Sequence, residues 1–386
     1  MTAGTTTLAG QILTPFGWLA GRVRCSSAIL AVEPAADVPK GRFILPGFVD
    51  LHVHGGHGAD CMEGEDAVRH MARFHARHGT TALLATTVTA PAADIRRAFA
   101  GITAVVERPE PGAARVLGAH LEGPFISPGA LGAQPPYAVA PDLALVDELA
   151  AMAPLRVATM APEIDPDGTL LARLAQHGCR VQIGHTTCSY DQARIALVAG
   201  ATGFTHLFNA MTGLHHRKAG AVGCALAHAR WAEMIFDLLH VEEGTVRTAM
   251  RAVPGLYGVT DAVAATGMPD GEYRLGRHHI FKRGDEVRLA DGSLAGSALT
   301  MAGALRNLLA LGLPLEEASG RLSTLPADYL GLGERGRIVP GAAADLVVVD
   351  GDGRLSTVLT EGKVVADVSR SAAPWASGKV EDSATY

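Results

Sequence analysis

Two histidines stand two positions apart at the end of an apolar run, in the segment FVDLHVHG that covers residues 48–55. Successive side chains of a β-strand alternate between its faces, so His52 and His54 would point to the same side. Two imidazoles at the end of a strand suit a divalent metal that prefers nitrogen ligands. The alternative is a pair of buried histidines that only satisfy hydrogen bonds, and it is disfavoured because ligand-type residues end other apolar runs as well. The spacing therefore predicts a metal site.

Ionisable side chains end several of the later apolar runs. These residues are Glu122, His185, His206, His240 and Asp261. Such groups are seldom buried without a partner or a metal. Five histidines and two carboxylates at six strand ends are difficult to attribute to packing alone, so we expect these side chains to meet at one site.

The elements that would position these residues are apolar runs that alternate with segments of helical periodicity. Eight such runs lie at residues 48–54, 81–87, 115–122, 156–163, 180–185, 203–208, 232–239 and 256–261. Strand and helix alternating eight times is the pattern of a (β/α)₈ TIM barrel, an α/β fold whose active site forms at the carboxyl ends of its strands. A doubly wound open sheet is the alternative, but no GxGxxG turn follows the first run. We expect the barrel to span residues 47–336.

The two ends of the chain have a different pattern. Residues 1–46 and 337–386 contain short strand-like pieces and almost no helical period. Because chain termini often lie close together, we expect both ends to pair into one small β-sandwich domain. From residue 369 onward the chain is rich in Ser, Ala and charged residues, and we expect its end to be poorly ordered.

The composition excludes several classes of protein. A net charge of −6 and a pI near 6.2 disfavour a general nucleic-acid or anionic-membrane binder. The five cysteines are odd in number and form no CxxC pair, which favours reduced thiols over a disulfide framework. No signal peptide is evident, and no run reaches the ~20 apolar residues of a transmembrane helix. We therefore expect a soluble cytoplasmic protein.

Seven segments, most of them around these residues, identify a known family. They read LPGFVDLHVHGG, GAHLEGPFISP, IGHTTCSYDQA, GFTHLFNAMTGLHHRKAG, LLHVEEG, GVTDAVAATG and DGSLAGSALTM. Over nearly its whole length the chain resembles the N-acetylglucosamine-6-phosphate deacetylases of the amidohydrolase superfamily. HLEGPF and THLFNAM carry the resemblance to this family, whereas the closing GRIVPGAAADLVVVD is shared with the wider superfamily.

The resemblance implies one or two divalent metals in each subunit. Glu122, His185 and His206 would hold the principal metal, and Glu122 would take the role that a carboxylated lysine has in many relatives. His52 and His54 would complete a second position, which some members of the family lack. Zn²⁺ is the metal that we expect, with Fe²⁺, Mn²⁺ or Co²⁺ as alternatives.

Asp261 corresponds to the catalytic carboxylate of the family. An amide carbonyl is a poor electrophile and an amine a poor leaving group, so hydrolysis needs a Lewis acid and a proton carrier. The resemblance implies that metal-activated water attacks the carbonyl. Asp261 would take a proton from that water and later deliver one to the leaving nitrogen. The alternative for Asp261 is a structural cap of the segment that follows.

The resemblance assigns phosphate recognition to Asn209, the backbone at Ala210, Arg217 and His240. An arginine offers a planar fork of donors to phosphate oxygens. For Arg217 the alternative is a solvated loop residue. One position departs from the family, because Gln134 stands where a histidine is expected to contact the acyl group. A glutamine amide can donate a hydrogen bond to a carbonyl, but it cannot become cationic.

These expectations describe a metal-dependent hydrolase that removes acetate from N-acetylglucosamine 6-phosphate and leaves glucosamine 6-phosphate. Relatives are commonly homodimers in which a neighbouring subunit borders the phosphate pocket, so a homodimer is expected by analogy. The nearest alternative substrate is N-acetylgalactosamine 6-phosphate or another acylated amino sugar. A cyclic-amide hydrolase is disfavoured by HLEGPF and by the absence of a metal-bridging lysine motif. A catalytically silent barrel is disfavoured because the ligand set is complete.

Overall fold

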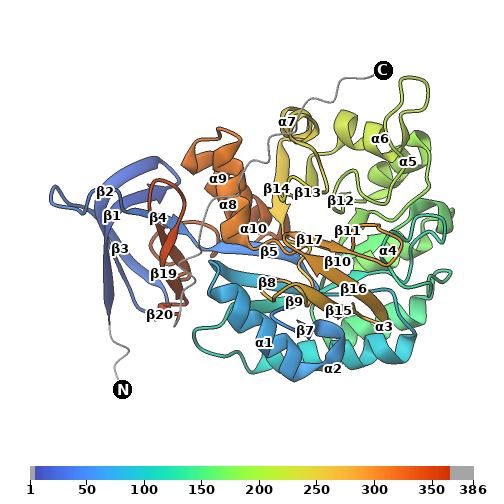
Figure 1. The fold of residues 1–386 in the computed structure, drawn as a ribbon, viewed down its shortest axis with the longest axis horizontal. Coiled ribbons are helices and arrows are strands. Elements are labelled where there is room, and N and C mark those ends of the chain that lie inside the picture. The colour runs from blue at the N-terminus through green and yellow to red at the C-terminus, as the bar shows by residue number, and fades with distance from the viewer. Residues whose placement is uncertain (1–4, 366–386) are drawn as a thin grey trace.

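The computed structural model describes residues 5–365, and its largest sheet is a parallel barrel of eight strands (Figure 1). The strands are β5 (Phe48–Val53), β8 (Thr80–Thr87), β9 (Arg115–Glu122), β10 (Leu155–Met160), β11 (Arg180–Ile183), β12 (Gly203–Phe204), β13 (Trp231–Ile235) and β14 (Gly255–Val259). They follow one another around the barrel in chain order. The N–H groups of His54 and Gly55 donate to the carbonyl of Ala262, which brings the end of the last strand beside the first. The predicted (β/α)₈ barrel is confirmed.

Helices follow the strands and enclose the barrel. They are α1 (Glu65–Ala76), α2 (Ala92–Glu107), α3 (Leu143–Met152), α4 (Thr169–Gln176), α5 (Tyr190–Ala199), α6 (Gly220–His228), α7 (Glu243–Ala252), α8 (Met301–Ala310), α9 (Leu315–Leu322) and α10 (Thr324–Leu330), with 3₁₀ turns at Cys61–Glu63 and Pro162–Ile164. Because helices cover the outer face and side chains fill the interior, the strands are largely buried, and all eight residues of β8 are buried. Local signals set the helix ends: Ser189 and Gln192 form a capping box on α5, and Gly200 ends it with a φ of 118°.

Several strands are shorter at their carboxyl ends than the sequence pattern predicts. The runs 180–185 and 203–208 end as strands at Ile183 and Phe204. His185 and His206 lie two residues beyond those ends with φ angles of 46° and 26°, and Asp261 follows β14 with a φ of 52°. A left-handed backbone cannot continue a strand, and residues other than glycine seldom adopt it. These three residues therefore lie on strained turns at the rim, a geometry that is common at functional sites.

A three-stranded antiparallel sheet is inserted between β14 and α8. It consists of β15 (Gly271–Leu275), β16 (His278–Arg283) and β17 (Glu286–Arg288). Many of its side chains are exposed and its apolar alternation is weak, so the sequence pattern does not predict it. A second small addition is the hairpin of β6 (Gly55–Gly56) and β7 (Ala59–Asp60), directly after the first barrel strand.

Both ends of the chain contribute to a separate seven-stranded mixed sheet with the order β20-β19-β18-β4-β1-β2-β3. Its strands are β1 (Thr6–Thr14), β2 (Gly17–Cys25), β3 (Ile29–Pro34), β4 (Phe43–Pro46), β18 (Leu346–Val349), β19 (Leu355–Thr360) and β20 (Lys363–Val364). Leu8 and Val23 share one buried cluster with Leu346 and Leu359, so the two halves of the sheet face a common core, as in a sandwich. Residues 366–386, including the tail from residue 369 that we expect to be poorly ordered, lie outside the described part.

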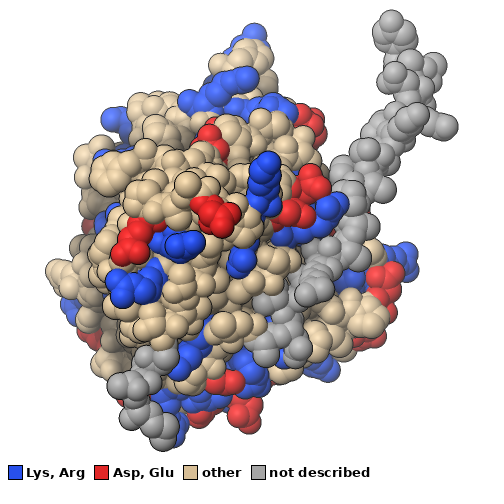
Figure 2. Space-filling model, turned by 90° about the vertical axis from the view of Figure 1, so that its left-hand side faces the viewer, with Lys and Arg blue, Asp and Glu red and all other residues tan. Residues whose placement is uncertain are grey.

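Figure 1 shows α8, α9 and α10 between this small domain and the barrel. On the face of the small domain, Lys and Arg side chains are interspersed with Asp and Glu side chains (Figure 2). Within residues 5–365, none of the helices combines the length and the apolar character that a membrane crossing requires.

Candidate active site

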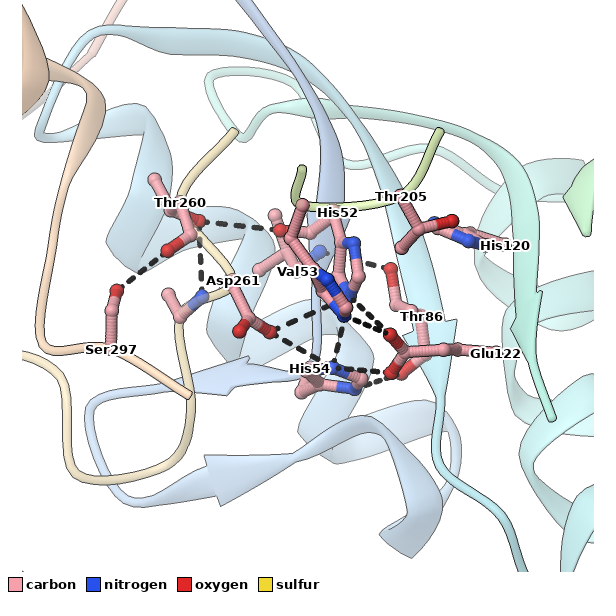
Figure 3. Close-up of polar contacts among 12 residues, drawn as sticks. His52, Val53, His54, Thr86, His120, Glu122, Thr205, Thr260, Asp261 and Ser297 are labelled. Carbon is pink, nitrogen blue, oxygen red and sulfur yellow. Dashed lines mark hydrogen bonds and ion pairs between the residues drawn. The ribbon is translucent and has the colours of Figure 1, made fainter. Parts of the chain in front are cut away.

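Glu122, the last residue of β9, lies between two pairs of histidines. Its Oε1 atom is 3.0 Å from His206 Nε2 and 3.1 Å from His185 Nε2. Its Oε2 atom is 3.2 Å from His54 Nε2, and His52 Nε2 lies 3.4 Å from Oε1. All five side chains are buried. The structure thus brings together the five predicted ligands from four different strand ends (Figure 3 shows three of them).

Three of these histidines are oriented by an acceptor at Nδ1. His54 Nδ1 lies 3.0 Å from the carbonyl oxygen of Thr86, and His185 Nδ1 lies 3.0 Å from that of Ala130. A carbonyl oxygen cannot donate, so in both rings Nδ1 carries a hydrogen, and in the neutral form of each ring Nε2 has a free lone pair. His52 Nδ1 instead faces a carboxylate, that of Glu233, at 3.0 Å.

The arrangement of the Nε2 atoms fits a metal centre. His52 Nε2 and His54 Nε2 are 3.2 Å apart, and His185 Nε2 and His206 Nε2 are 3.0 Å apart. Lone pairs that face each other at this distance repel unless a cation lies between them. The ligand atoms of two triads, one with His52 and His54 and one with His185 and His206, each lie within 4.8 Å of one another and share Glu122. Imidazole nitrogens and a carboxylate form a donor set that is typical of divalent transition metals.

Asp261 lies beside the His52–His54 pair, across the seam that closes the barrel. Its Oδ1 atom is 3.1 Å from His54 Nε2 and 3.4 Å from His52 Nε2, and its backbone N–H donates to the carbonyl of His52 at 2.9 Å. The residue before it is held by Asp50, which accepts both the N–H and the hydroxyl of Thr260 at 3.1 and 2.6 Å. Backbone and side-chain bonds therefore fix the Asp261 carboxylate against the histidines.

The carboxylates and the imidazoles of this cluster shift each other's pKa values towards the charged forms. Burial raises the pKa of Asp261, but the His52 and His54 imidazoles lower it by more, to about 2. Burial lowers the pKa of His54, but hydrogen bonds to Asp261 and Glu122 raise it to about 9. The carboxylates thus stabilise positive charge at the histidine nitrogens, and a divalent cation can supply that charge in place of protons.

A cavity of about 150 Å³ opens onto the cluster. It is lined by Asn209, Ala210, Gln134 and His240 together with candidate ligands and Asp261. Leu275 of the inserted sheet and Leu294 close one side of it with apolar surface. The cavity therefore places polar recognition groups, an apolar wall and the ligand cluster around one small volume.

Comparison with known proteins decides the family. The family model described as Amidohydrolase family matches residues 43–370. The chain belongs to the amidohydrolase family. An N-acetylgalactosamine-6-phosphate deacetylase from Escherichia coli O157:H7 is 37% identical over 371 residues, which cover 93% of this chain and 98% of the relative. An N-acetylglucosamine-6-phosphate deacetylase from Vibrio furnissii is 38% identical over 339 residues, covering 85% and 84%.

Solved structures agree with this assignment. A mutant N-acetyl-D-glucosamine-6-phosphate deacetylase from Mycobacterium smegmatis, in complex with N-acetyl-D-glucosamine-6-phosphate, has a TM-score of 0.87 and 34% identity. The match covers 94% of this amidohydrolase and 99% of that chain. An N-acetylglucosamine-6-phosphate deacetylase from Thermotoga maritima has a TM-score of 0.86 at 31% identity and covers 93% and 99%.

The predicted substrate residues of this amidohydrolase fall into two groups. His240 lines the cavity, and its Nδ1 atom lies 2.6 Å from Asp237 Oδ2. Burial lowers the pKa of His240, but the hydrogen bond to Asp237 raises it by more. Asn209, also at the cavity, donates to the carbonyl of His206 at 3.0 Å. Arg217 instead lies on an exposed turn and is not among the described residues that line the cavity.

Gln134 is buried, and both ends of its amide are engaged. Its Oε1 atom accepts the backbone N–H of Thr89 at 2.7 Å, and its Nε2 group donates to Glu122 Oε2. The residue thus ties the loop after β8 to a candidate metal ligand. Its amide nitrogen carries two hydrogens, and the contact with Glu122 uses one of them.

The sequence pattern left two glutamates near the cluster without an assigned role. Glu233 on β13 was missed, although an acidic residue inside an apolar strand run is itself a signal. Glu163 was assigned no role, and it accepts hydrogen bonds from the hydroxyl groups of Thr186 and Thr187, at 2.5 and 2.9 Å, directly after His185. Glu233 thus contacts the ring of a candidate ligand, whereas Glu163 bonds only to the two threonines that follow one.

Proposed function

We propose that this amidohydrolase hydrolyses the acetamide of N-acetyl-D-glucosamine 6-phosphate to D-glucosamine 6-phosphate and acetate. The observation that carries the proposal is the convergence of Glu122, His185, His206 and Asp261 on one cavity. The deacetylase relatives match nearly the full length of the chain and support the coarser assignment, an amino-sugar-6-phosphate deacetylase. Soluble N-acetylated sugar phosphates are small, polar and anionic, which suits a small cavity with polar donors.

The metal assignment follows the two histidine pairs. Glu122, His185 and His206 would hold the principal divalent metal, and His52 and His54 a second one, with Zn²⁺ as the expected ion and Fe²⁺, Mn²⁺ or Co²⁺ as alternatives. A divalent metal held there supplies a Lewis acid for the amide carbonyl and lowers the pKa of water towards neutrality.

Asp261 would carry the protons of the reaction. Its carboxylate accepts a proton from the attacking water as the new C–O bond forms. The protonated carboxyl then donates that proton to the amide nitrogen as the C–N bond breaks, so that the amine leaves neutral and Asp261 is again ionised. The low pKa of the carboxyl keeps it ionised before the reaction, as a base must be.

Substrate recognition would use the far side of the cavity. His240, whose positive form Asp237 stabilises, is suited to an anionic or hydroxyl oxygen. The Asn209 amide and the backbone N–H of Ala210 would add further donors, and Gln134 lies on the side of the metal cluster, where an acyl group would bind.

Arg217 is too exposed to serve the cavity of its own chain in the observed arrangement, and a homodimer would give it a role. Leu214 on the same turn is 59% exposed, and Ile195 and Val198 on α5 are 61% and 81% exposed. Apolar side chains of this kind at one corner of the molecule suit an interface. We propose that Arg217 binds phosphate in the pocket of a neighbouring subunit, and light scattering of the purified protein tests the dimer.

The chain divides into two domains. We propose that residues 1–46 and 337–386 form the small domain and residues 47–336 the catalytic barrel.

The cysteines indicate the cellular location. All five are free and buried, which is typical of proteins in a reducing compartment, and we propose a cytoplasmic location.

The second candidate substrate is N-acetyl-D-galactosamine 6-phosphate. The relative from E. coli O157:H7, which is named for that sugar, matches more of the chain than the V. furnissii relative at nearly the same identity. The two sugars differ in one hydroxyl orientation at C4. Measuring kcat/KM for both, with acetate release as the readout, tests the proposal. A preference for the glucosamine epimer supports it, and a preference of tenfold or more for the galactosamine epimer replaces it with the second candidate.

A further inference from the structure

The carboxylate of Glu233 is buried inside the barrel beside the candidate ligands. Glu233 lies on β13, and none of its surface is exposed. Burying a charge is costly unless donors or opposite charges surround it. Its neighbours therefore indicate what the carboxylate does.

The described neighbours of this carboxylate act as donors. Its Oε2 atom lies 3.0 Å from His52 Nδ1 and accepts the backbone N–H of His206 at 3.3 Å. Its Oε1 atom accepts the hydroxyl of Tyr257 at 3.4 Å. Tyr257 in turn accepts an N–H from the Gln182 amide at 2.8 Å, which leaves its own hydrogen for Glu233. Glu233 thus contacts one residue from each of the two histidine pairs.

The contact with His52 selects the tautomer of that ring. An ionised carboxylate has no hydrogen to donate, so His52 Nδ1 carries the hydrogen and Nε2 keeps its lone pair. This Nε2 atom faces His54 Nε2 at 3.2 Å, Asp261 Oδ1 at 3.4 Å and Glu122 Oε1 at 3.4 Å. Four electron-rich atoms meet at this point, and a cation is the species that stabilises them all.

The charge of the cluster leads to the same conclusion. Glu122, Glu233 and Asp261 are buried carboxylates, and among residues 5–365 their ion pairs are with imidazoles and with no lysine or arginine. When the histidines bind as neutral ligands, one divalent cation leaves the three carboxylates with a net negative charge, whereas two divalent cations more than balance them.

We propose that Glu233 is a positioning residue that sets the occupancy of the metal position beside His52 and His54. It fixes the His52 tautomer that exposes Nε2, and it adds the buried negative charge that a second cation balances. His54 and His185 are oriented by backbone carbonyls, which no substitution removes, so Glu233 is the partner through which this site can be altered. The inference rests on the proposed metal centre, but its test measures metal binding and not deacetylation.

The test is a Zn²⁺ titration of metal-free wild type and Glu233→Gln by calorimetry, with metal content after dialysis measured by mass spectrometry. We expect two equivalents in the wild type. In Glu233→Gln we expect one position to be unchanged and the other to bind at least ~10-fold more weakly, as substitutions of groups that orient a ligand histidine typically do. A wild type that binds a single equivalent, or a variant that binds both as tightly as the wild type, overturns the proposal.

Glu163→Gln is the matched control. Glu163 is a half-buried glutamate that, like Glu233, accepts several hydrogen bonds, but its partners are Thr186 and Thr187 and not an imidazole. This variant should keep two equivalents with unchanged affinities. If it loses the same metal as Glu233→Gln, the effect is not specific to His52 and the proposal fails.

A measurement on the wild type keeps the proposal testable if Glu233→Gln does not fold. In the holoenzyme labelled with ¹⁵N-histidine, the His52 ring, assigned from a His52→Gln spectrum, should carry its hydrogen on Nδ1. A hydrogen on Nε2 contradicts the proposal. If both metals bind as expected and no amino-sugar phosphate is deacetylated, the proposed function fails while the role of Glu233 stands.

Discussion

The Oδ1 atom of Asp261 lies 3.1 Å from the Nε2 atom of His54, across the seam where the last barrel strand meets the first. The two residues are held in place from the backbone, because Asp261 N–H donates to the His52 carbonyl and His54 N–H donates to the Ala262 carbonyl. The proposed proton carrier and a proposed metal ligand therefore belong to one rigid unit. This unit allows the role of the carboxylate to be separated from that of the metal.

Replacing Asp261 with asparagine should leave the metal content unchanged and lower kcat by ~10²-fold or more, because general acid–base catalysis is removed. The amide is nearly isosteric and can keep the contact with His54, so the histidines should remain in position. Metal analysis and steady-state kinetics on the same preparation provide the check. Turnover close to that of the wild type would show that another group carries the protons.

Removing the metal should abolish hydrolysis and also destabilise the fold. A ligand present at a thousandfold excess over its Kd stabilises the native state by about 4 kcal/mol, and stripping it removes that contribution. The histidine nitrogens would then face each other without a cation. Activity and urea unfolding before chelation, after it, and after return of Zn²⁺ measure both effects. A chelated protein that keeps full activity, or a well-folded sample that binds no Zn²⁺, Fe²⁺ or Mn²⁺, contradicts the metal centre.

The buried His75 should make the protein sensitive to acid. His75 Nε2 lies 2.9 Å from the carbonyl of Gly55, its Nδ1 atom is buried without a hydrogen-bond partner, and burial lowers its pKa from 6.5 to about 4. Because the unfolded chain binds this proton more readily, the stabilisation is complete above pH 6.5 and is lost as the pH falls towards 4. Between pH 7 and pH 5 the loss from this group is ~2 kcal/mol.

A comparison with His75→Gln isolates this effect, since the glutamine amide can still donate to the Gly55 carbonyl but does not titrate. The unfolding free energy of the variant, measured by urea titration at both pH values, should fall less than that of the wild type. An equal fall in unfolding free energy for the two proteins would show that other groups cause the acid sensitivity.

Gln134 links the loop after β8 to Glu122. We therefore expect Gln134→His to keep stability and metal affinity better than Gln134→Ala does. Gln134→His should fold, bind metal and remain active, because a ring N–H can replace the amide donor to Glu122. Gln134→Ala leaves the Thr89 N–H and one Glu122 oxygen without this partner, which should cost about 1–3 kcal/mol of stability and weaken metal binding ~10-fold. Thermal unfolding and metal titration of the two variants check the order. Loss of metal from Gln134→His, or no change in Gln134→Ala, contradicts this role.

The sequence was sufficient to predict the barrel and the ligand residues at its strand ends. It was not sufficient to predict the contacts between side chains of different strands or the positions of the loops. The spacing of His52 and His54 places both rings on one face because a strand alternates its side chains, and this holds in any barrel. The contact between Glu233 and His52 could not be predicted, because contacts across a barrel interior depend on the tilt and stagger of its strands. The exposed position of Arg217 depends on a loop whose conformation has no periodic signal. The inserted sheet that brings Leu275 to the cavity was missed for the same reason.

The most direct test of the account compares kcat/KM for N-acetyl-D-glucosamine 6-phosphate with that for the unphosphorylated sugar, in the wild type and in Arg217→Ala. We expect a preference of ~10²-fold or more for the phosphorylated sugar, equivalent to several kcal/mol of binding to the phosphate, and a smaller preference in the variant. Equal rates for the two sugars, or no acetate release from either by the metal-loaded enzyme, would show that this amidohydrolase acts on a different amide.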